Sequence, residues 1–347
     1  MSARVWLVVV SCLVSVVTGL VLSRSPGGAL PQARAKPLIG LSLDTLKEER
    51  WQSDRDLFVK RAGELGAEVL VQAANSDDTR QMQDIEALIS RKVDALVIVP
   101  HNGAAMVKAV NLAHEAGIPV LDYDRMIPDS DVDLYVSFDA VRIGRMQAQY
   151  LVDRFAGRWP KKIVRIYGAK TDANSHLMKQ GQDEILAPLI KDRKIVVVHE
   201  DWTEDWKPEN AKKIMQAALT NAGQGIDAVL AANDGTAGGA IQALTEEGLA
   251  GKVIVTGQDA ELAACQRIVR GTQAMTIYKR LKILSGAAAE AAYKLATRKP
   301  IVAKDEVDNG REKVPAILID SVVATKDNML STVAADGFHS REEIYGQ

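Results

Sequence analysis

Short apolar runs alternate with amphipathic segments along most of the chain, and this alternation limits the fold more than any other feature. The runs are mostly continuous and rich in Val and Ile, as in "DALVIVP" at 94–100, which is typical of strands covered by helices on both faces. The segments between them, such as "DTRQMQDIEALISRK" at 78–92, repeat apolar residues three and four positions apart, as amphipathic helices do. Strand, helix and strand in repetition predict parallel sheets with right-handed crossovers.

The apolar runs outnumber the strands of a common single sheet, so we predict an α/β fold with two similar doubly wound lobes. The chain is expected to cross from the first lobe to the second near Asp139. The segment beyond Lys279 has no sheet of its own in this pattern, and we expect it to return to the two lobes. The predicted strands span 38–44, 68–75, 94–100, 118–124, 134–139, 162–169, 194–201, 227–234, 252–259 and 274–279.

The N-terminus differs from the rest of the chain. An apolar run covers residues 5–22, and the small-residue triplet Ala-Arg-Ala at 33–35 suits signal peptidase. We expect 1–35 to be a signal peptide that directs the protein to the periplasm. Two alternatives are an uncleaved membrane anchor, because the run is about long enough to span a bilayer, and a lipoprotein acylated at Cys12. If Cys12 leaves with the signal peptide, Cys265 is alone and no internal disulfide forms.

Composition argues against several classes of function. The 347 residues carry a formal net charge of −2, so nucleic acid and anionic membrane surfaces are not expected as partners. The five histidines are scattered without the spacing of metal ligands, so we predict no metal site. The sequence contains no dinucleotide-binding or phosphate-binding glycine motif, no nucleophile elbow and no zinc-protease motif. We therefore expect no catalytic residues, no enzyme activity and no cofactor. We also expect the protein to be a monomer.

Polar side chains follow the predicted strands where each one ends. In "PVLDYDRM" at 119–126, two acids and an arginine directly follow a buried apolar run. Ligands of open parallel sheets bind beyond the carboxyl ends of the strands, although Asp and Asn there also form turns and helix N-caps. Arg125 and Lys279 are not explained by turns or caps, and they predict an acidic or hydroxylated ligand. The polar residues at strand ends are Asp44, Asn75, Asp124, Arg125, Asp139, Asp172, Asn174, Asn233, Asp234, Asp259 and Lys279.

Tryptophans lie beside these polar positions. Trp51 follows the first predicted strand, and Trp202 and Trp206 lie in "EDWTEDWKPENA" after another. An aromatic ring beside carboxylates, guanidinium groups and amides is the combination that holds a sugar, whose C–H face lies on the ring while its hydroxyls form paired hydrogen bonds. We expect Trp202 instead to fasten a helix start to its lobe.

From Lys36 to about Phe338 the chain resembles the periplasmic sugar-binding proteins of ABC importers, the type I two-lobed class, and within it the members that bind D-xylose. The resemblance implies two Rossmann-like lobes joined by a three-segment hinge, which close over the ligand. It implies an N-terminal lobe of 36–141 plus 280–309 and a C-terminal lobe of 142–279 plus 310–347. The stretches that carry it include "ERWQSDRDLFVKRAGELGA", "DYDRM", "AANDGTAGGAIQALTEEGL", "GTQAMTIYK" and "DGFH".

The same resemblance implies a set of sugar-binding residues. Trp206 matches a ring-stacking position, and Trp51 is expected to form the opposite wall. Related proteins tend to have a second asparagine where this chain has Ala173, so the fine specificity there is expected to differ. The implied ligand-binding residues are Arg50, Trp51, Asp124, Arg125, Asp172, Asn174, Trp206, Asn233, Asp259 and Lys279.

Three acids and three cations in this set sum to zero charge, which favours a neutral ligand. We expect a protein that captures a neutral monosaccharide, D-xylose or a related pyranose, and delivers it to the membrane permease of an ABC importer. One alternative is a membrane-tethered sugar sensor for a signalling kinase, and another is a broader pyranose specificity that includes glucose and galactose. A sugar-responsive repressor would need a helix-turn-helix segment before the first strand, where this chain has an export signal.

Overall fold

The computed structural model describes residues 36–222 and 225–346. Its first sheet has seven strands in the order β11-β12-β5-β4-β3-β1-β2, all parallel except β11, which is antiparallel to β12. This order places β4 in the middle of the sheet and β1 next to the edge strand β2, and both strands precede predicted site residues. The strands are β1 (Leu38–Leu43), β2 (Glu68–Ala73), β3 (Ala95–Val99), β4 (Val120–Tyr123), β5 (Leu134–Phe138), β11 (Asp305–Asp308) and β12 (Lys313–Ile319).

Helices cover both faces of this sheet, which is why its central strands are continuous apolar runs. One core cluster joins the sheet to α2 and α10 through residues such as Phe58 and Leu284. A second cluster joins the other face to α3 and α4 through residues such as Leu88 and Met106. The four helices are α2 (Glu49–Glu64), α3 (Asp78–Ser90), α4 (Gly103–Glu115) and α10 (Leu281–Ala296).

The second sheet has four parallel strands in the order β7-β6-β8-β9. Helices α5 and α6 pack on one face and α7 and α8 on the other. In chain order these elements are α5 (Ala140–Phe155), β6 (Lys161–Tyr167), α6 (Ala173–Lys191), β7 (Ile195–Trp202), α7 (Pro208–Ala222), β8 (Ala228–Ala231), α8 (Asp234–Glu246) and β9 (Ile254–Val255).

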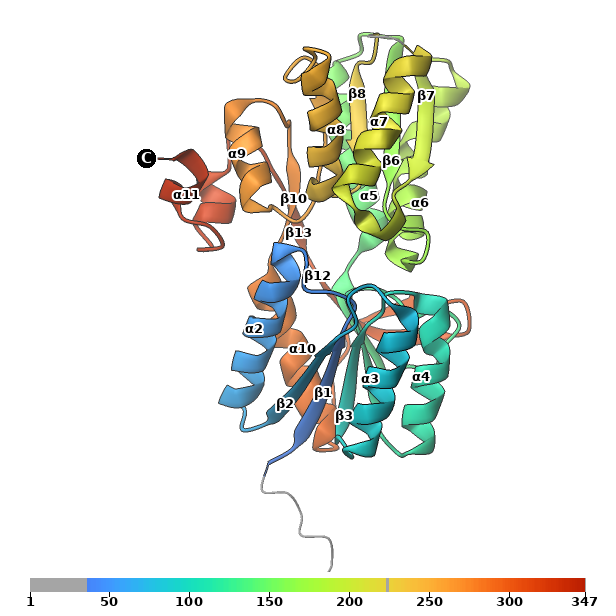
Figure 1. The fold of residues 1–347 in the computed structure, drawn as a ribbon, viewed down its shortest axis with the longest axis vertical. Coiled ribbons are helices and arrows are strands. Elements are labelled where there is room, and N and C mark those ends of the chain that lie inside the picture. Colours follow the sequence, from blue (N-terminus) through green and yellow to red (C-terminus); the bar gives the residue numbers. More distant parts are fainter. Residues whose placement is uncertain (1–35, 223–224, 347) are drawn as a thin grey trace, which may run out of the picture. The chain divides into compact units, whose positions relative to one another are not determined.

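A small antiparallel pair, β10 (Thr276–Lys279) and β13 (Ser321–Ala324), lies beside the second sheet (Figure 1). Near it are the short helices α9 (Leu262–Arg270) and α11 (Arg341–Tyr345), which share a core cluster with β10. Three connections join the two sheet systems: β5 to α5, β10 to α10, and β12 to β13. The predicted fold class, two doubly wound lobes with a three-segment hinge, is therefore confirmed.

Every predicted strand is present, although β9 is only two residues long. The segment beyond Lys279 returns to both sheet systems, as expected. The predicted lobe boundary at 309/310 is different from the boundary that the sheets define, because β12 pairs in parallel with β5, from Ala316 opposite Tyr135 to Ile319 opposite Phe138. The first sheet thus continues to Ile319. Only part of β12 is buried, so its sequence lacks the continuous apolar run that marks the central strands.

The predicted signal peptide, the alternative anchor and the alternative acylation site at Cys12 lie in residues 1–35, outside the described part of the chain. Within the described residues, no helix is both long enough and apolar enough to cross a membrane.

Candidate ligand-binding pocket

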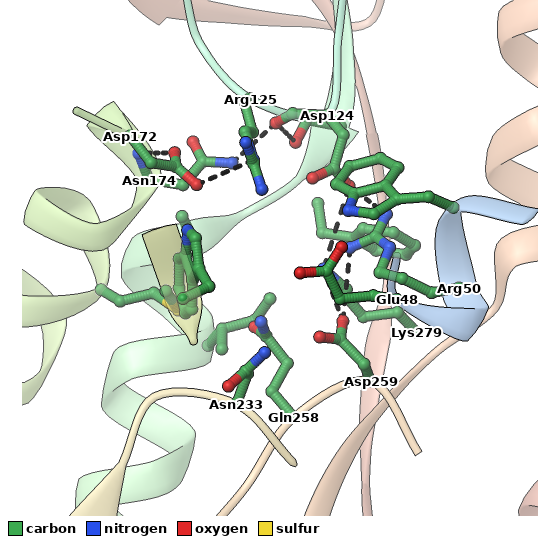
Figure 2. Close-up of a pocket in the computed structure, with 17 residues that line it drawn as sticks. Glu48, Arg50, Asp124, Arg125, Asp172, Asn174, Asn233, Gln258, Asp259 and Lys279 are labelled. Atoms are coloured by element: carbon green, nitrogen blue, oxygen red, sulfur yellow. Dashed lines mark hydrogen bonds and ion pairs between the residues drawn. The ribbon is translucent and has the colours of Figure 1, made fainter. Parts of the chain in front are cut away.

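One pocket brings together all the ligand-binding residues predicted from the sequence (Figure 2). They converge because each lies at or beyond the carboxyl end of a strand. Arg50 and Trp51 come after β1 and Asp124 and Arg125 after β4, Lys279 ends β10, and the others follow strands of the second sheet. The pocket-lining residues that the sequence did not indicate are Glu48, Ser137, Phe138, Ala140, Ile143, Met178 and Gln258.

Arg50 is the centre of a buried ion-pair network on one side of the pocket. Its Nη2 lies 2.8 Å from Asp124 Oδ2 and 2.9 Å from Asp54 Oδ2, and its Nη1 lies 3.3 Å from Asp259 Oδ1. Lys279 Nζ also reaches Asp259 Oδ1, at 3.0 Å. Each of these side chains is at most 7% exposed. Asp259 follows β9, so the network links the first lobe to the second.

The electrostatics of Asp124 follow from this network. Burial by itself raises the pKa of a carboxyl, but Arg50 and then Lys279 outweigh burial and hold the pKa of Asp124 at about 2. Asp124 is therefore ionised at any physiological pH and acts only as a hydrogen-bond acceptor.

Arg125 makes a second link between the lobes. Its Nη1 lies 2.6 Å from Asp44 Oδ2, at the end of β1, and its Nε lies 3.0 Å from Asp172 Oδ2, at the start of α6. Burial raises the pKa of Asp172, and Arg125 offsets only part of that rise. The Asp44 carboxylate also contacts His101, whose Nδ1 lies 3.0 Å from Asp44 Oδ1. A continuous chain of charges thus runs from His101 to Asp172.

The "DYDRM" segment, which ends β4 and continues into a loop, is held in place by hydrogen bonds. Asp122 accepts a hydrogen bond from the Ile127 N–H at 2.7 Å and so shapes the turn. Asp124 has a φ of 63°, in the left-handed region that is costly for a non-glycine residue. The Asp124 carbonyl accepts hydrogen bonds from Ser137 Oγ at 2.6 Å and Asn174 Nδ2 at 2.7 Å, which fix this conformation. Asp122 therefore stabilises the turn, whereas Asp124 and Arg125 line the pocket.

Two predicted site residues also cap helices, as turn-forming residues at strand ends commonly do. Asp172 accepts a hydrogen bond from the Asn174 N–H at 2.9 Å while it pairs with Arg125. Asn233 accepts one from the Thr236 N–H at 2.8 Å and still lines the pocket. Capping and pocket lining are thus combined in the same side chains, and capping fixes their direction.

Trp206 occupies the pocket because the opposing backbone carries no side chain. A Cβ at Gly168 would lie 2.1 Å from Trp206 Cη2, so only glycine lets the indole ring pack there. The indole Nε1 is buried and has no hydrogen-bond partner among the described residues. Trp202 contacts the rings of Tyr167 and His176 instead, and it does not line the pocket.

Trp51 forms a different part of the wall. The guanidinium carbon of Arg50 lies 4.1 Å from the centre of the Trp51 ring, and that of Arg125 lies 5.2 Å from it. These cation–π contacts hold the ring and both cations in fixed positions. Phe138, Ile143 and Met178 add an apolar surface. The pocket therefore combines hydrogen-bonding groups, two indole rings and an apolar wall, which suits a ligand with many hydroxyls and an apolar face.

The charge of the site is more negative than the six predicted residues indicate. Asp44 and Asp54 are buried and pair with Arg125 and Arg50, so they add two carboxylates to a set that otherwise sums to zero. Both cations already have carboxylate partners. Within the described residues, no group of His, Cys, Asp and Glu side chains is arranged to hold a metal ion.

The chain is similar to several characterised proteins. A family model described as "Periplasmic binding protein domain" matches residues 39–300. The D-xylose-binding periplasmic protein of Haemophilus influenzae is 47% identical over 314 residues, which cover 90% of this chain and 94% of the relative. The D-xylose-binding periplasmic protein of Escherichia coli is 46% identical over 313 residues, again 90% of this chain and 94% of the relative.

The fold of this chain is also similar to that of a solved sugar-bound transport protein. A carbohydrate transporter solute-binding protein from Chloroflexus aurantiacus, crystallised in complex with D-glucose, has a TM-score of 0.83 and 32% identity, and the match covers 88% of this chain and 97% of that chain.

Proposed function

Because the chain belongs to the periplasmic binding protein family, we propose that it captures D-xylose or a related neutral pyranose between its lobes in the periplasm. It then presents the sugar to the membrane permease of an ABC importer, and it works as a monomer. The observation that carries this proposal is the pocket itself, in which all the predicted sugar-binding residues line one buried space between the two sheet systems.

The charges of the pocket support a neutral ligand. Arg50, Arg125 and Lys279 each have buried carboxylate partners within 3.3 Å, so none is left to neutralise an acidic ligand. A carboxylate brought into this space would be desolvated beside other carboxylates, which is expensive. Hydroxyl groups can instead donate to the ionised Asp124 and accept from the indole N–H of Trp206.

The ion pairs between lobes support a clamp. Arg50 with Asp259 and Arg125 with Asp172 both join the first lobe to the second. A ligand that contacts both lobes favours the closed form by its differential affinity for the two states. Capture between lobes also hides the sugar from water and fixes its orientation for transfer.

Isothermal titration calorimetry of the mature protein with D-xylose, D-glucose and D-xylonate tests the proposal. We expect binding of at least one neutral sugar and little or no binding of xylonate. Xylonate binding tighter than either neutral sugar, or the absence of binding for every sugar in a panel of neutral pyranoses, would overturn it.

A further inference from the structure

Glu48 is a pocket-lining carboxyl that the predicted site does not include. It occupies the N-cap position of α2, but its side chain makes no capping hydrogen bond to the helix. The side chain turns to the pocket instead, where it lies on the same side as Arg50 and Asp259 (Figure 2). Glu is not among the residues preferred at the N-cap, so helix capping does not account for the direction of this side chain.

The partners of the pocket carboxylates set Glu48 apart. Asp124, Asp172 and Asp259 each pair with a cation at 3.0 Å or less. Glu48 has no such pair among the described residues, and its Oε2 is buried without a hydrogen-bond partner. A buried polar atom without a partner is costly, so this oxygen requires a donor that the described protein groups do not supply.

The surroundings of Glu48 define which donor fits. Burial raises the pKa of Glu48; its own backbone N–H and Arg125 oppose that rise, and the nearby charges of Asp44 and Asp259 add to it. The local field is therefore unfavourable for another anion, and a neutral hydrogen-bond donor avoids that cost. A hydroxyl group of a sugar meets that requirement without adding charge.

We propose that Glu48 is a specificity-determining residue that accepts a hydrogen bond from one hydroxyl group of the bound sugar. This inference rests on the proposed sugar-binding function. The site then selects pyranoses that present a hydroxyl donor at the Glu48 side and discriminates against derivatives that lack it. A pocket built to hydrogen-bond a ligand hydroxyl rejects the analogue without that hydroxyl, because its polar group stays unpaired.

The test compares the wild type with Glu48→Leu and Glu48→Gln by calorimetry, using D-xylose and its 2-deoxy, 3-deoxy and 4-deoxy derivatives. Loss of a hydrogen bond to a charged group corresponds to roughly a tenfold to hundredfold loss of affinity. Glu48→Leu is expected to bind D-xylose more weakly by that factor. Glu48→Gln keeps an acceptor oxygen and is expected to lose less. One deoxy derivative should bind the wild type weakly and lose nothing further in Glu48→Leu.

Glu49→Leu is the matched control, because Glu49 is the adjacent residue, is exposed and does not line the pocket. Thermal melting without sugar checks that each variant is folded. If the wild type binds D-xylose but Glu48→Leu binds all four sugars as tightly as Glu49→Leu, the inference is wrong and the proposed function stands. Absence of neutral-sugar binding by the wild type refutes the proposed function itself.

Discussion

Replacing Arg125 by Met tests whether the closed pocket depends on its buried cations. Met fills much of the space of the arginine side chain but removes its charge, so Asp44 and Asp172 lose a partner at 2.6 Å and 3.0 Å. Truncating one member of a buried, hydrogen-bonded charge pair costs roughly 2–5 kcal/mol. The Asp44 pair lies within the first lobe and is present before closure, so its loss lowers folding stability more than binding.

The ion pair between Arg125 and Asp172 joins the lobes, so its loss is expected to weaken ligand binding. We expect Arg125→Met to weaken D-xylose binding by about 2–4 kcal/mol, or ~30- to 700-fold in Kd. Calorimetry measures the change, and Arg55→Met is the control, because Arg55 pairs at the surface with Asp56, which is 67% exposed. D-xylose binding by Arg125→Met within threefold of the wild type would refute this account of the cation.

Three further predictions concern the aromatic wall and the charge chain. Trp206→Ala should weaken sugar binding at least tenfold more than Trp202→Ala, measured by calorimetry, since only Trp206 lines the pocket. Gly168→Ala should also weaken binding, because its Cβ would lie 2.1 Å from the indole of Trp206. The hydrogen bond to Asp44 raises the pKa of His101. Protonated His101 should therefore stabilise the folded protein fully below about pH 6.5, and this stabilisation should be lost as the pH rises through the raised pKa of the folded state. Melting temperatures from pH 5.5 to 8.5 should show this loss.

Each of these predictions has a matched control. Gly63→Ala controls for glycine replacement, because a Cβ there meets nothing within 4 Å. His101→Gln should lack the pH-dependent part of the melting curve, and an identical pH profile for this variant and the wild type would contradict the assignment. Equal binding losses for Trp202→Ala and Trp206→Ala would show that the stacking role is assigned to the wrong ring.

The positions of the predicted site residues could be inferred from sequence because parallel strands point their carboxyl ends to one edge of a sheet. Residues such as Arg50 and Asp124, which follow strands β1 and β4 of the same sheet, are therefore expected near one another. The spacing of Arg50, Asp54 and Phe58 at intervals of four also carried a signal, since it places them on one helix face. Asp54 is fully buried there, although its charged neighbourhood in the sequence suggests a surface position.

Other parts of the pocket left no signal in the sequence. Glu48 and Glu49 are adjacent acids in "KEER", and only the direction of the chain between β1 and α2 turns one to the pocket and the other to solvent. Phe138 and Met178 line the pocket, but in sequence they are indistinguishable from core residues. Strand β12, which lies next to the edge strand β11, alternates buried and exposed residues along part of its length, so it lacks the continuous apolar run that is typical of the central strands.

The two arginines of the pocket share an arrangement that bears on how the lobes can open again. Arg50 contacts Asp54 and Asp124 of its own lobe and Asp259 of the other, and Arg125 contacts Asp44 of its own lobe and Asp172 of the other. A cation whose only partner lay across the cleft would be stranded whenever the lobes separated. Because each arginine keeps a carboxylate within its own lobe, opening breaks one ion pair without leaving an unpaired cation. The free-energy difference between the open and closed states without ligand then stays small, so the differential affinity of the sugar for the two states determines which one is populated.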